Sequence, residues 1–67
     1  MRVVDGYLSR LMQSVWPDAI VYKDGSNANF VVERPGAEPV GLGMNFGDAK
    51  AAVLVLRRQW KAIQGGG

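Results

Sequence analysis

The chain has 67 residues and neither Cys nor His, which excludes a disulfide framework and a typical zinc site. Eight Lys and Arg residues against six Asp and Glu residues give a net charge of +2, a mild preference for anionic partners that is far below the excess of a nucleic-acid tail. We expect one small core held by packing alone, and self-association as a homodimer would add burial.

No membrane or secretion signal is expected. The longest apolar run covers only residues 51–56, which is too short to span a bilayer. Arg2 and Asp5 bracket only two apolar residues, so we expect no signal peptide, a cytoplasmic location and no membrane partner. Residues 1–64 are expected to form a single domain, and the three glycines 65–67 a flexible tail.

The first predicted element is an amphipathic helix. Apolar residues recur at three- and four-residue spacing, which predicts a helix over about residues 3–15. Gly6 weakens its first turn, so a start at an Asp5 cap is the alternative. Pro17 ends the helix because proline lacks an N–H group and displaces the preceding residue from the helical region. Trp16 is either a lid on the core or an exposed anchor for a partner.

Three strands are predicted next. Runs rich in β-branched and aromatic residues at 19–23 and 28–34 flank a turn at 24–27, which predicts an antiparallel hairpin. Residues 40–44 alternate large apolar residues with glycine, which predicts a third strand. The period of two places one set in the core: Ile20, Tyr22, Phe30, Val32, Val40, Leu42 and Met44. The other face would carry Val21, Lys23, Val31, Glu33, Gly41 and Gly43.

The last third of the chain, residues 45–64, predicts a second helix and holds the largest cluster of cations. Asn45 is a good N-cap, and Asp48 three residues later imitates a capping box. At about 100° per residue, one side of this helix faces the core: Ala49, Ala52, Val53, Leu56, Trp60 and Ile63. The order αβββα predicts a two-layer α+β domain, in which two helices cover one face of a three-stranded antiparallel meander.

The αβββα order and the segment from Gly41-x-Gly43-x-Asn45 to Ala49-Lys50 together resemble the double-stranded RNA-binding domain. In that family a lysine pair at the start of the second helix holds phosphates across the major groove, whereas Phe46 and Gly47 stand here. The family also inserts its first hairpin loop into a minor groove, and the loop at residues 24–27 has an acid and no cation. The resemblance thus implies the fold, and it implies RNA binding only through Lys50.

Catalysis is not expected, because the chain has no His or Cys to serve as a base or nucleophile. Ser9, Ser14 and Ser26 stand in no nucleophile motif. The carboxylates are scattered in caps, turns and strand ends, and the glycine pair lacks the third glycine of a dinucleotide fingerprint. The sequence predicts no catalytic residue, metal ligand, cofactor or small-molecule substrate.

The candidate binding surface is a basic and apolar face of the C-terminal helix. Leu54 lies about 40° from Lys50 on the helix wheel, inside the charged stripe, and the helix has more apolar surface than one sheet can cover. The alternative is a solvated face whose cations favour the helix C-terminus. The predicted partner-binding residues are Lys50, Leu54, Val55, Arg57, Arg58 and Lys61.

These observations predict a non-catalytic protein-binding module. Its partner would be a protein with an acidic surface or a second copy of the chain, as for a small phage or bacterial protein that modulates or inhibits a larger host protein. The alternative is a nucleic-acid-binding domain, similar to the double-stranded RNA-binding domain, that contacts the phosphate backbone with the same helix. Both hypotheses use the same cations.

Overall fold

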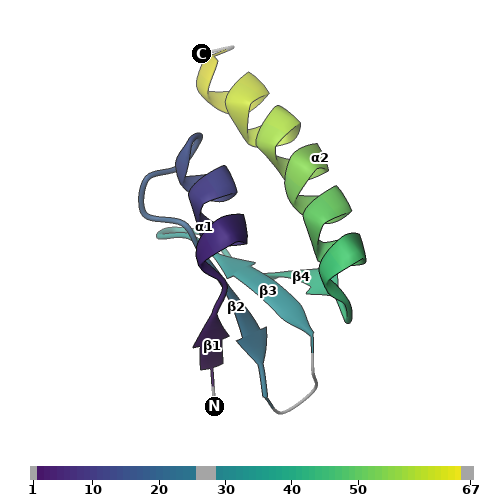
Figure 1. Ribbon diagram of the computed structural model, residues 1–67. Coiled ribbons are helices and arrows are strands. Elements are labelled where there is room, and N and C mark those ends of the chain that lie inside the picture. The colour runs from purple at the N-terminus through teal and green to yellow at the C-terminus, as the bar shows by residue number, and fades with distance from the viewer. Residues whose placement is uncertain (1, 26–28, 66–67) are drawn as a thin grey trace.

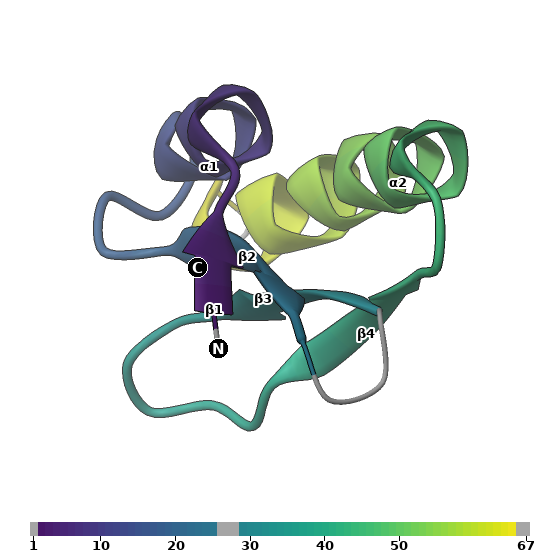
Figure 2. The same cartoon turned by 60° about the horizontal axis from the view of Figure 1, so that its bottom comes forward.

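The computed structural model describes residues 2–25 and 29–65. Its elements follow in the order β1 (Arg2–Val4), α1 (Gly6–Gln13), β2 (Ile20–Asp24), β3 (Phe30–Glu33), β4 (Val40–Gly43) and α2 (Phe46–Gly65). The strands form one antiparallel sheet in the order β1-β2-β3-β4, and both helices lie on the same side of it (Figure 1 and Figure 2). The predicted α+β class and the two helices on one face are confirmed.

The predicted αβββα order missed one strand, so the sheet has four strands rather than three. Residues 2–4 extend as the edge strand β1, with Val3 opposite Lys23 of β2. The β-branched side chains of Val3 and Val4 favour this extended backbone. The helix start that the apolar spacing predicts, at about residue 3, is therefore three residues too early.

α1 is shorter than predicted at both ends. The Asp5 carboxylate accepts a hydrogen bond of 2.8 Å from the Leu8 N–H group, so the helix begins at Gly6. This is the alternative that the weak Gly6 position allowed. The helix ends at Gln13, two residues before the predicted end, and Ser14 is its C-cap.

The core lies between the two helices and the sheet face toward them. Its buried residues are Leu8, Met12, Val15, Ala19, Val21, Phe30, Val32, Leu42, Ala49, Val53 and Trp60. The predicted core positions in β3 and at Ala49, Val53 and Trp60 are confirmed. Trp16 is half-buried against this cluster and is therefore a lid on the core.

The two faces of β2 were exchanged in the prediction. Val21 is fully buried and pairs with Val32, whereas Ile20 is 44% exposed and pairs with Glu33. Paired residues share a face, so Val21 points toward the helices, and its neighbour Tyr22 is buried on the outer face instead. The predicted alternation of side chains along β2 was right. The face assigned to each set was wrong, because the hairpin register decides which residues pair.

A β-bulge interrupts β4. Val31 pairs with Gly41, but Phe30 pairs with Gly43, so Leu42 is the extra residue. Gly43 has φ +117, a conformation that glycine adopts without a Cβ clash. The bulge buries Leu42 and breaks the strict alternation that the sequence suggested.

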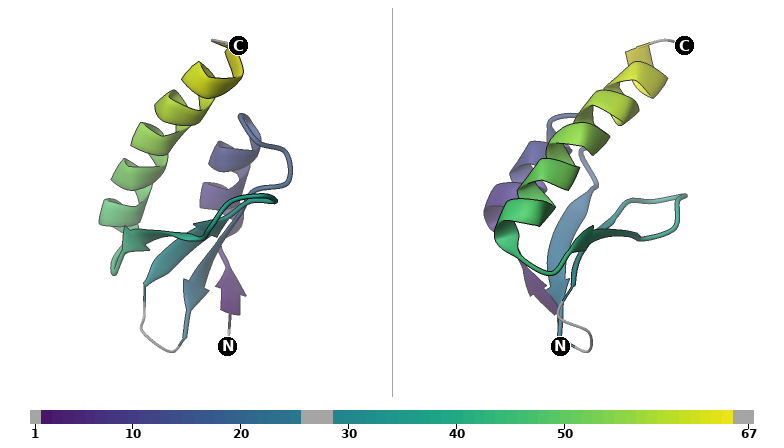
Figure 3. Two further views of the ribbon diagram at one scale, coloured as in Figure 1. Left: turned by 180° about the vertical axis from the view of Figure 1, so that it is seen from behind. Right: turned by 90° about the vertical axis from the view of Figure 1, so that its right-hand side faces the viewer.

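Three further residues that were predicted to lie in the core are exposed: Val40, Met44 and Ile63. Val40 begins the edge strand β4, and Met44 follows the bulge. Ile63 lies in the part of α2 that projects beyond the sheet and α1 (Figure 3). In all three cases the apolar pattern in the sequence continues beyond the part of the strand or helix that packs against the opposite layer.

α2 begins as predicted. Asn45 Oδ1 accepts a hydrogen bond of 2.8 Å from the Asp48 N–H group, and Asn45 Nδ2 donates one of 3.0 Å to Asp48 Oδ2. The helix continues to Gly65, one residue past the predicted domain end, while residues 66 and 67 of the predicted tail and residues 26–28 of the predicted hairpin lie outside the described residues. In the described chain, neither helix combines the length and hydropathy needed to cross a bilayer.

Candidate binding surface

The second half of α2 lines a basic pocket beside the end of α1. Leu54, Arg57, Arg58 and Lys61 follow the spacing i, i+3, i+4 and i+7, which places them on one face of the helix. Val15, which ends the turn after α1, closes the pocket. Its volume is about 320 Å³. We refer to Val15, Leu54, Arg57, Arg58 and Lys61 as the basic groove.

The cations of the basic groove lack acidic partners in the described chain. Within residues 2–25 and 29–65, no ion pair or hydrogen bond joins Arg57, Arg58 or Lys61 to a carboxylate. Arg57 Nε is buried and has no hydrogen-bond acceptor among these residues. The groove thus presents three cations of one sign, which favours the entry of an anionic group.

Two of the six predicted site residues lie away from the groove. Val55 is exposed but is not among the described residues that line the pocket, because it lies about 160° around the helix from Arg57. Lys50 lies about one turn before Leu54 and does not line the pocket; its Nζ is 5.6 Å from the centroid of the Tyr7 ring. The structure brings together the other four: Leu54, Arg57, Arg58 and Lys61.

Sequence reasoning missed Arg34, which follows β3. Its guanidinium carbon lies 4.2 Å from the Trp16 ring centroid and 4.5 Å from that of Trp60. The two indoles meet edge to face at 6.1 Å, so the guanidinium fills the corner between them. This cation–π packing fixes the turn of α2 that carries the groove. No local pattern signals it, because the three residues come from distant parts of the chain.

A second cavity, of about 400 Å³, lies between the start of β2 and the turn after β3. Its charged lining residues are Asp18, Glu33 and Arg34, which have both signs. The Glu33 carboxylate already accepts a hydrogen bond of 2.8 Å from the Tyr22 hydroxyl and pairs with Arg2 at 3.4 Å. This cavity therefore does not select a ligand by charge, in contrast to the basic groove.

The Tyr22 hydroxyl is part of the sheet's outer face. Its hydrogen bond to Glu33, with burial, raises the pKa of Tyr22 above its ordinary value of 10.0. The Arg2 guanidinium carbon lies 4.6 Å from the centroid of the same ring. The Tyr22 hydroxyl therefore stays protonated at neutral pH and links β2 to β3 as a structural contact.

The basic groove offers hydrogen-bond donors beside apolar side chains. The guanidinium groups of Arg57 and Arg58 present planar sets of donors that match carboxylate or phosphate oxygens. Leu54 and Val15 offer apolar contact beside them. Among the described residues, no group of three Asp or Glu side chains gathers as a metal site.

Comparison of the chain with protein-family models, with curated proteins and with solved structures found no match in any of the three.

Proposed function

We propose that the protein is a non-catalytic binding module that docks on a larger protein through the basic groove. The supporting observation is one pocket that combines three cations, none with an acidic partner in the described chain, with the apolar side chains of Leu54 and Val15. A surface that presents Asp or Glu beside apolar side chains complements both parts. Such docking suits a small phage or bacterial modulator or inhibitor of a host protein.

A second copy of the chain is a poor occupant of the basic groove. If two copies met there, the cations Arg57, Arg58 and Lys61 of one copy would face the same cations of the other. Like charges in contact cost on the order of several kcal/mol. None of the described lining residues is acidic to offset this repulsion. The partner of this groove is therefore a different molecule with an acidic surface.

The alternative is binding of the phosphate backbone of a nucleic acid. The cations on successive turns of α2, none with an acidic partner among the described residues, favour it, because each can neutralise one phosphate. Phosphates, however, make no use of the apolar wall that Leu54 and Val15 provide. With three cations aligned, binding to duplex would be weak, independent of sequence and steeply dependent on salt.

Capture from an extract of the cells that produce the protein, with and without nuclease, separates the two classes of partner. A protein partner remains bound after nuclease treatment. It is lost when the groove is neutralised by Arg57→Gln, Arg58→Gln and Lys61→Gln. Capture that disappears with nuclease would contradict the protein-binding proposal and support the nucleic-acid alternative.

A matched control removes the same charge elsewhere. The variant with Arg2→Gln, Arg10→Gln and Lys23→Gln changes three cations that are not among the described lining of the groove. It should capture the partner as the unmodified chain does. Equal loss in both triple variants would show that only net charge matters, which would contradict a defined groove.

A further inference from the structure

The basic groove is built by side chains rather than by free backbone groups. α2 continues for at least a full turn on both sides of the stretch from Leu54 to Lys61, so the N–H and C=O groups of this stretch pair within the helix. On the opposite side of the groove, the Val15 N–H group donates to the Met12 carbonyl at 3.0 Å. A segment that enters the groove therefore meets no free backbone N–H group among the described lining residues.

The described lining side chains also lack hydrogen-bond acceptors. Arg57, Arg58 and Lys61 only donate, and the side chains of Leu54 and Val15 have no polar atom. An extended peptide would bring its own backbone N–H groups to this surface and find no side-chain acceptor for them. An α-helix pairs its N–H and C=O groups internally, so it enters the groove without that cost. The lining therefore favours a helical segment over an extended one.

The place of the groove in the fold suits a third helix. α2 projects past the end of α1, so its last turns have no neighbouring helix in the described chain (Figure 3). From Leu54 to Lys61 the groove follows two turns of α2, which is about 10 Å along the helix axis. Its volume of about 320 Å³ is at the small end of ligand sites, so it admits a few side chains from one helix.

The charges of the groove set the chemistry of the incoming helix. The three charged lining residues are all cations, and Leu54 lies one turn before the first of them. A complementary face has acidic residues opposite the cations and an apolar residue opposite Leu54 and Val15. Carboxylates stabilise the N-terminal turn of a helix, and an antiparallel neighbour brings that turn to Lys61, near the C-terminal end of α2. In the partner the acidic residues then precede the apolar residue.

We propose that the partner inserts an amphipathic α-helix into the basic groove, antiparallel to α2, with acidic residues followed by an apolar residue on one face. The inference rests on the proposed function and adds the conformation and direction of the bound segment. The carboxylates of this helix face Arg57, Arg58 and Lys61, and its apolar side chain packs on Leu54.

Three synthetic peptides test the conformation. Each has about 18 residues, mostly Ala, because much shorter peptides form little helix in water. The helical probe carries Glu at positions i, i+3 and i+4 and Leu at i+7, which places all four on one face. The second peptide has the same composition with these four residues spread around the helix. The third is the helical probe with one central Ala replaced by Pro, which breaks the helix.

The peptides are titrated into the isotope-labelled chain and followed by NMR. The helical probe should bind with a dissociation constant of about 100 µM to 1 mM, the weak affinity expected for a contact of two helical turns. The shifted signals should be those of Leu54, Arg57, Arg58 and Lys61. Both control peptides should bind about tenfold more weakly or worse, because one lacks the common face and the other must be ordered on binding. Equal binding of all three peptides would overturn the proposal.

A matched pair of variants locates the bound helix. Leu54 is 42% exposed and Val55 is 54% exposed, but only Leu54 lines the groove. Leu54→Ala should weaken binding of the helical probe by about fivefold or more, and Val55→Ala should leave it unchanged. Equal effects of the two variants would overturn the placement of the helix in the groove.

The capture experiment separates this inference from the proposed function. If the unmodified chain retains a nuclease-resistant partner that the triple Gln variant loses, the proposed function stands. Should the helical probe then fail to bind at about 3 mM, only the helical inference is overturned. Capture that disappears with nuclease would contradict the proposed function itself.

Discussion

Ser9 is a buried polar residue of the core, and its hydroxyl completes the sheet. β1 ends at Val4, so the backbone of Val21 on β2 has no strand partner on that side. The Asp5 N–H group donates to the Val21 carbonyl at 2.8 Å. Ser9 Oγ accepts from the Val21 N–H group at 2.9 Å and donates to its carbonyl at 3.1 Å. One side chain of α1 thus replaces the end of a strand.

Ser9→Ala should destabilise the fold by about 1–3 kcal/mol, because it leaves the buried Val21 N–H group without an acceptor. Ser14→Ala is the control. The Ser14 hydroxyl donates to the Leu11 carbonyl at 2.7 Å in an exposed position, so its loss should cost no more than about 0.5 kcal/mol. Urea unfolding of the three chains measures both changes. Equal effects would show that the Ser9 hydroxyl is not needed by the strand.

Tyr22 makes the stability dependent on alkaline pH. Its pKa is raised in the folded state, so its contribution is fully present below its ordinary value of 10.0 and is lost as pH rises through the folded value. The unfolding free energy should therefore fall more steeply above this pH in the unmodified chain than in Tyr22→Phe. The two chains differ only at position 22, so the contributions of all other groups cancel in the difference. Identical slopes would contradict the hydrogen bond to Glu33.

At the scale of elements, the bulge in β4 positions the start of α2. Gly43 approaches the first turn of the helix so closely that an added Cβ would lie 3.0 Å from Asp48 Cβ. Its positive φ lets the chain turn from the strand into the cap at Asn45 within two residues. The bulge thereby sets where α2, which carries the basic groove, begins relative to the sheet.

Gly43→Ala should destabilise the protein by about 1–3 kcal/mol, since it adds both backbone strain and a contact with Asp48. Gly41→Ala should change the stability by no more than about 0.5 kcal/mol, because a Cβ at Gly41 meets no heavy atom within 4 Å. Thermal unfolding compares the two variants. A neutral Gly43→Ala would show that the bulge can be rebuilt without glycine.

Elements with strong local signals were predicted well, and their pairing was not. Asn45 and Asp48 define the start of α2 by capping alone, and the core face of its first half follows from helical spacing. The phase of β2 depends on its register with β3, which local pattern does not contain. β1 was missed because three residues are too few for a periodic signal. Its partner strand, β2, follows α1 in the sequence, so no local pattern shows the pairing.

The candidate site was predictable to the same degree. Helical spacing identified Leu54, Arg57, Arg58 and Lys61, and these four line one pocket. Val55 was predicted because it belongs to a further apolar edge of the helix that one sheet cannot cover, but that edge lies on another side of the helix from the groove. The roles of Val15 and Arg34 arise from tertiary contacts between the end of α1, the end of β3 and α2, and no spacing rule reaches that far.

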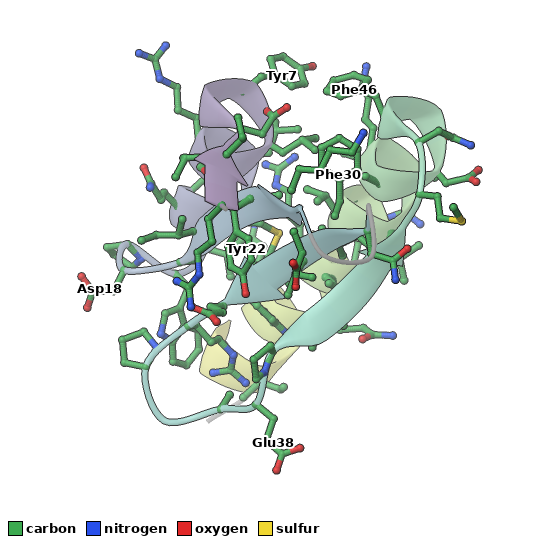
Figure 4. All side chains as sticks on the ribbon, turned by 90° about the horizontal axis from the view of Figure 1, so that it is seen from below. Tyr7, Asp18, Tyr22, Phe30, Glu38 and Phe46 are labelled. Carbon is green, nitrogen blue, oxygen red and sulfur yellow. The ribbon has the colours of Figure 1, made fainter. Side chains whose placement is uncertain are left out.

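For the whole molecule, α2 connects two surfaces of different character. Its first turn carries Phe46, whose ring centroid lies 6.0 Å from that of Tyr7, and both rings are partly exposed (Figure 4). Its second half lines the basic groove, where the described charges are all positive. We expect the basic groove to bind an acidic partner.

The kinetics of association with the captured partner test the central claim, that the basic groove is a protein interface. The triple variant Arg57→Gln, Arg58→Gln, Lys61→Gln should slow association by about tenfold or more at low salt, and the difference should shrink as salt is added. Leu54→Ala should act mainly on dissociation, because an apolar contact forms after encounter and is hardly screened. If the triple variant abolishes capture while Leu54→Ala behaves as the unmodified chain, recognition is by charge alone, and the phosphate backbone of a nucleic acid replaces a protein as the partner.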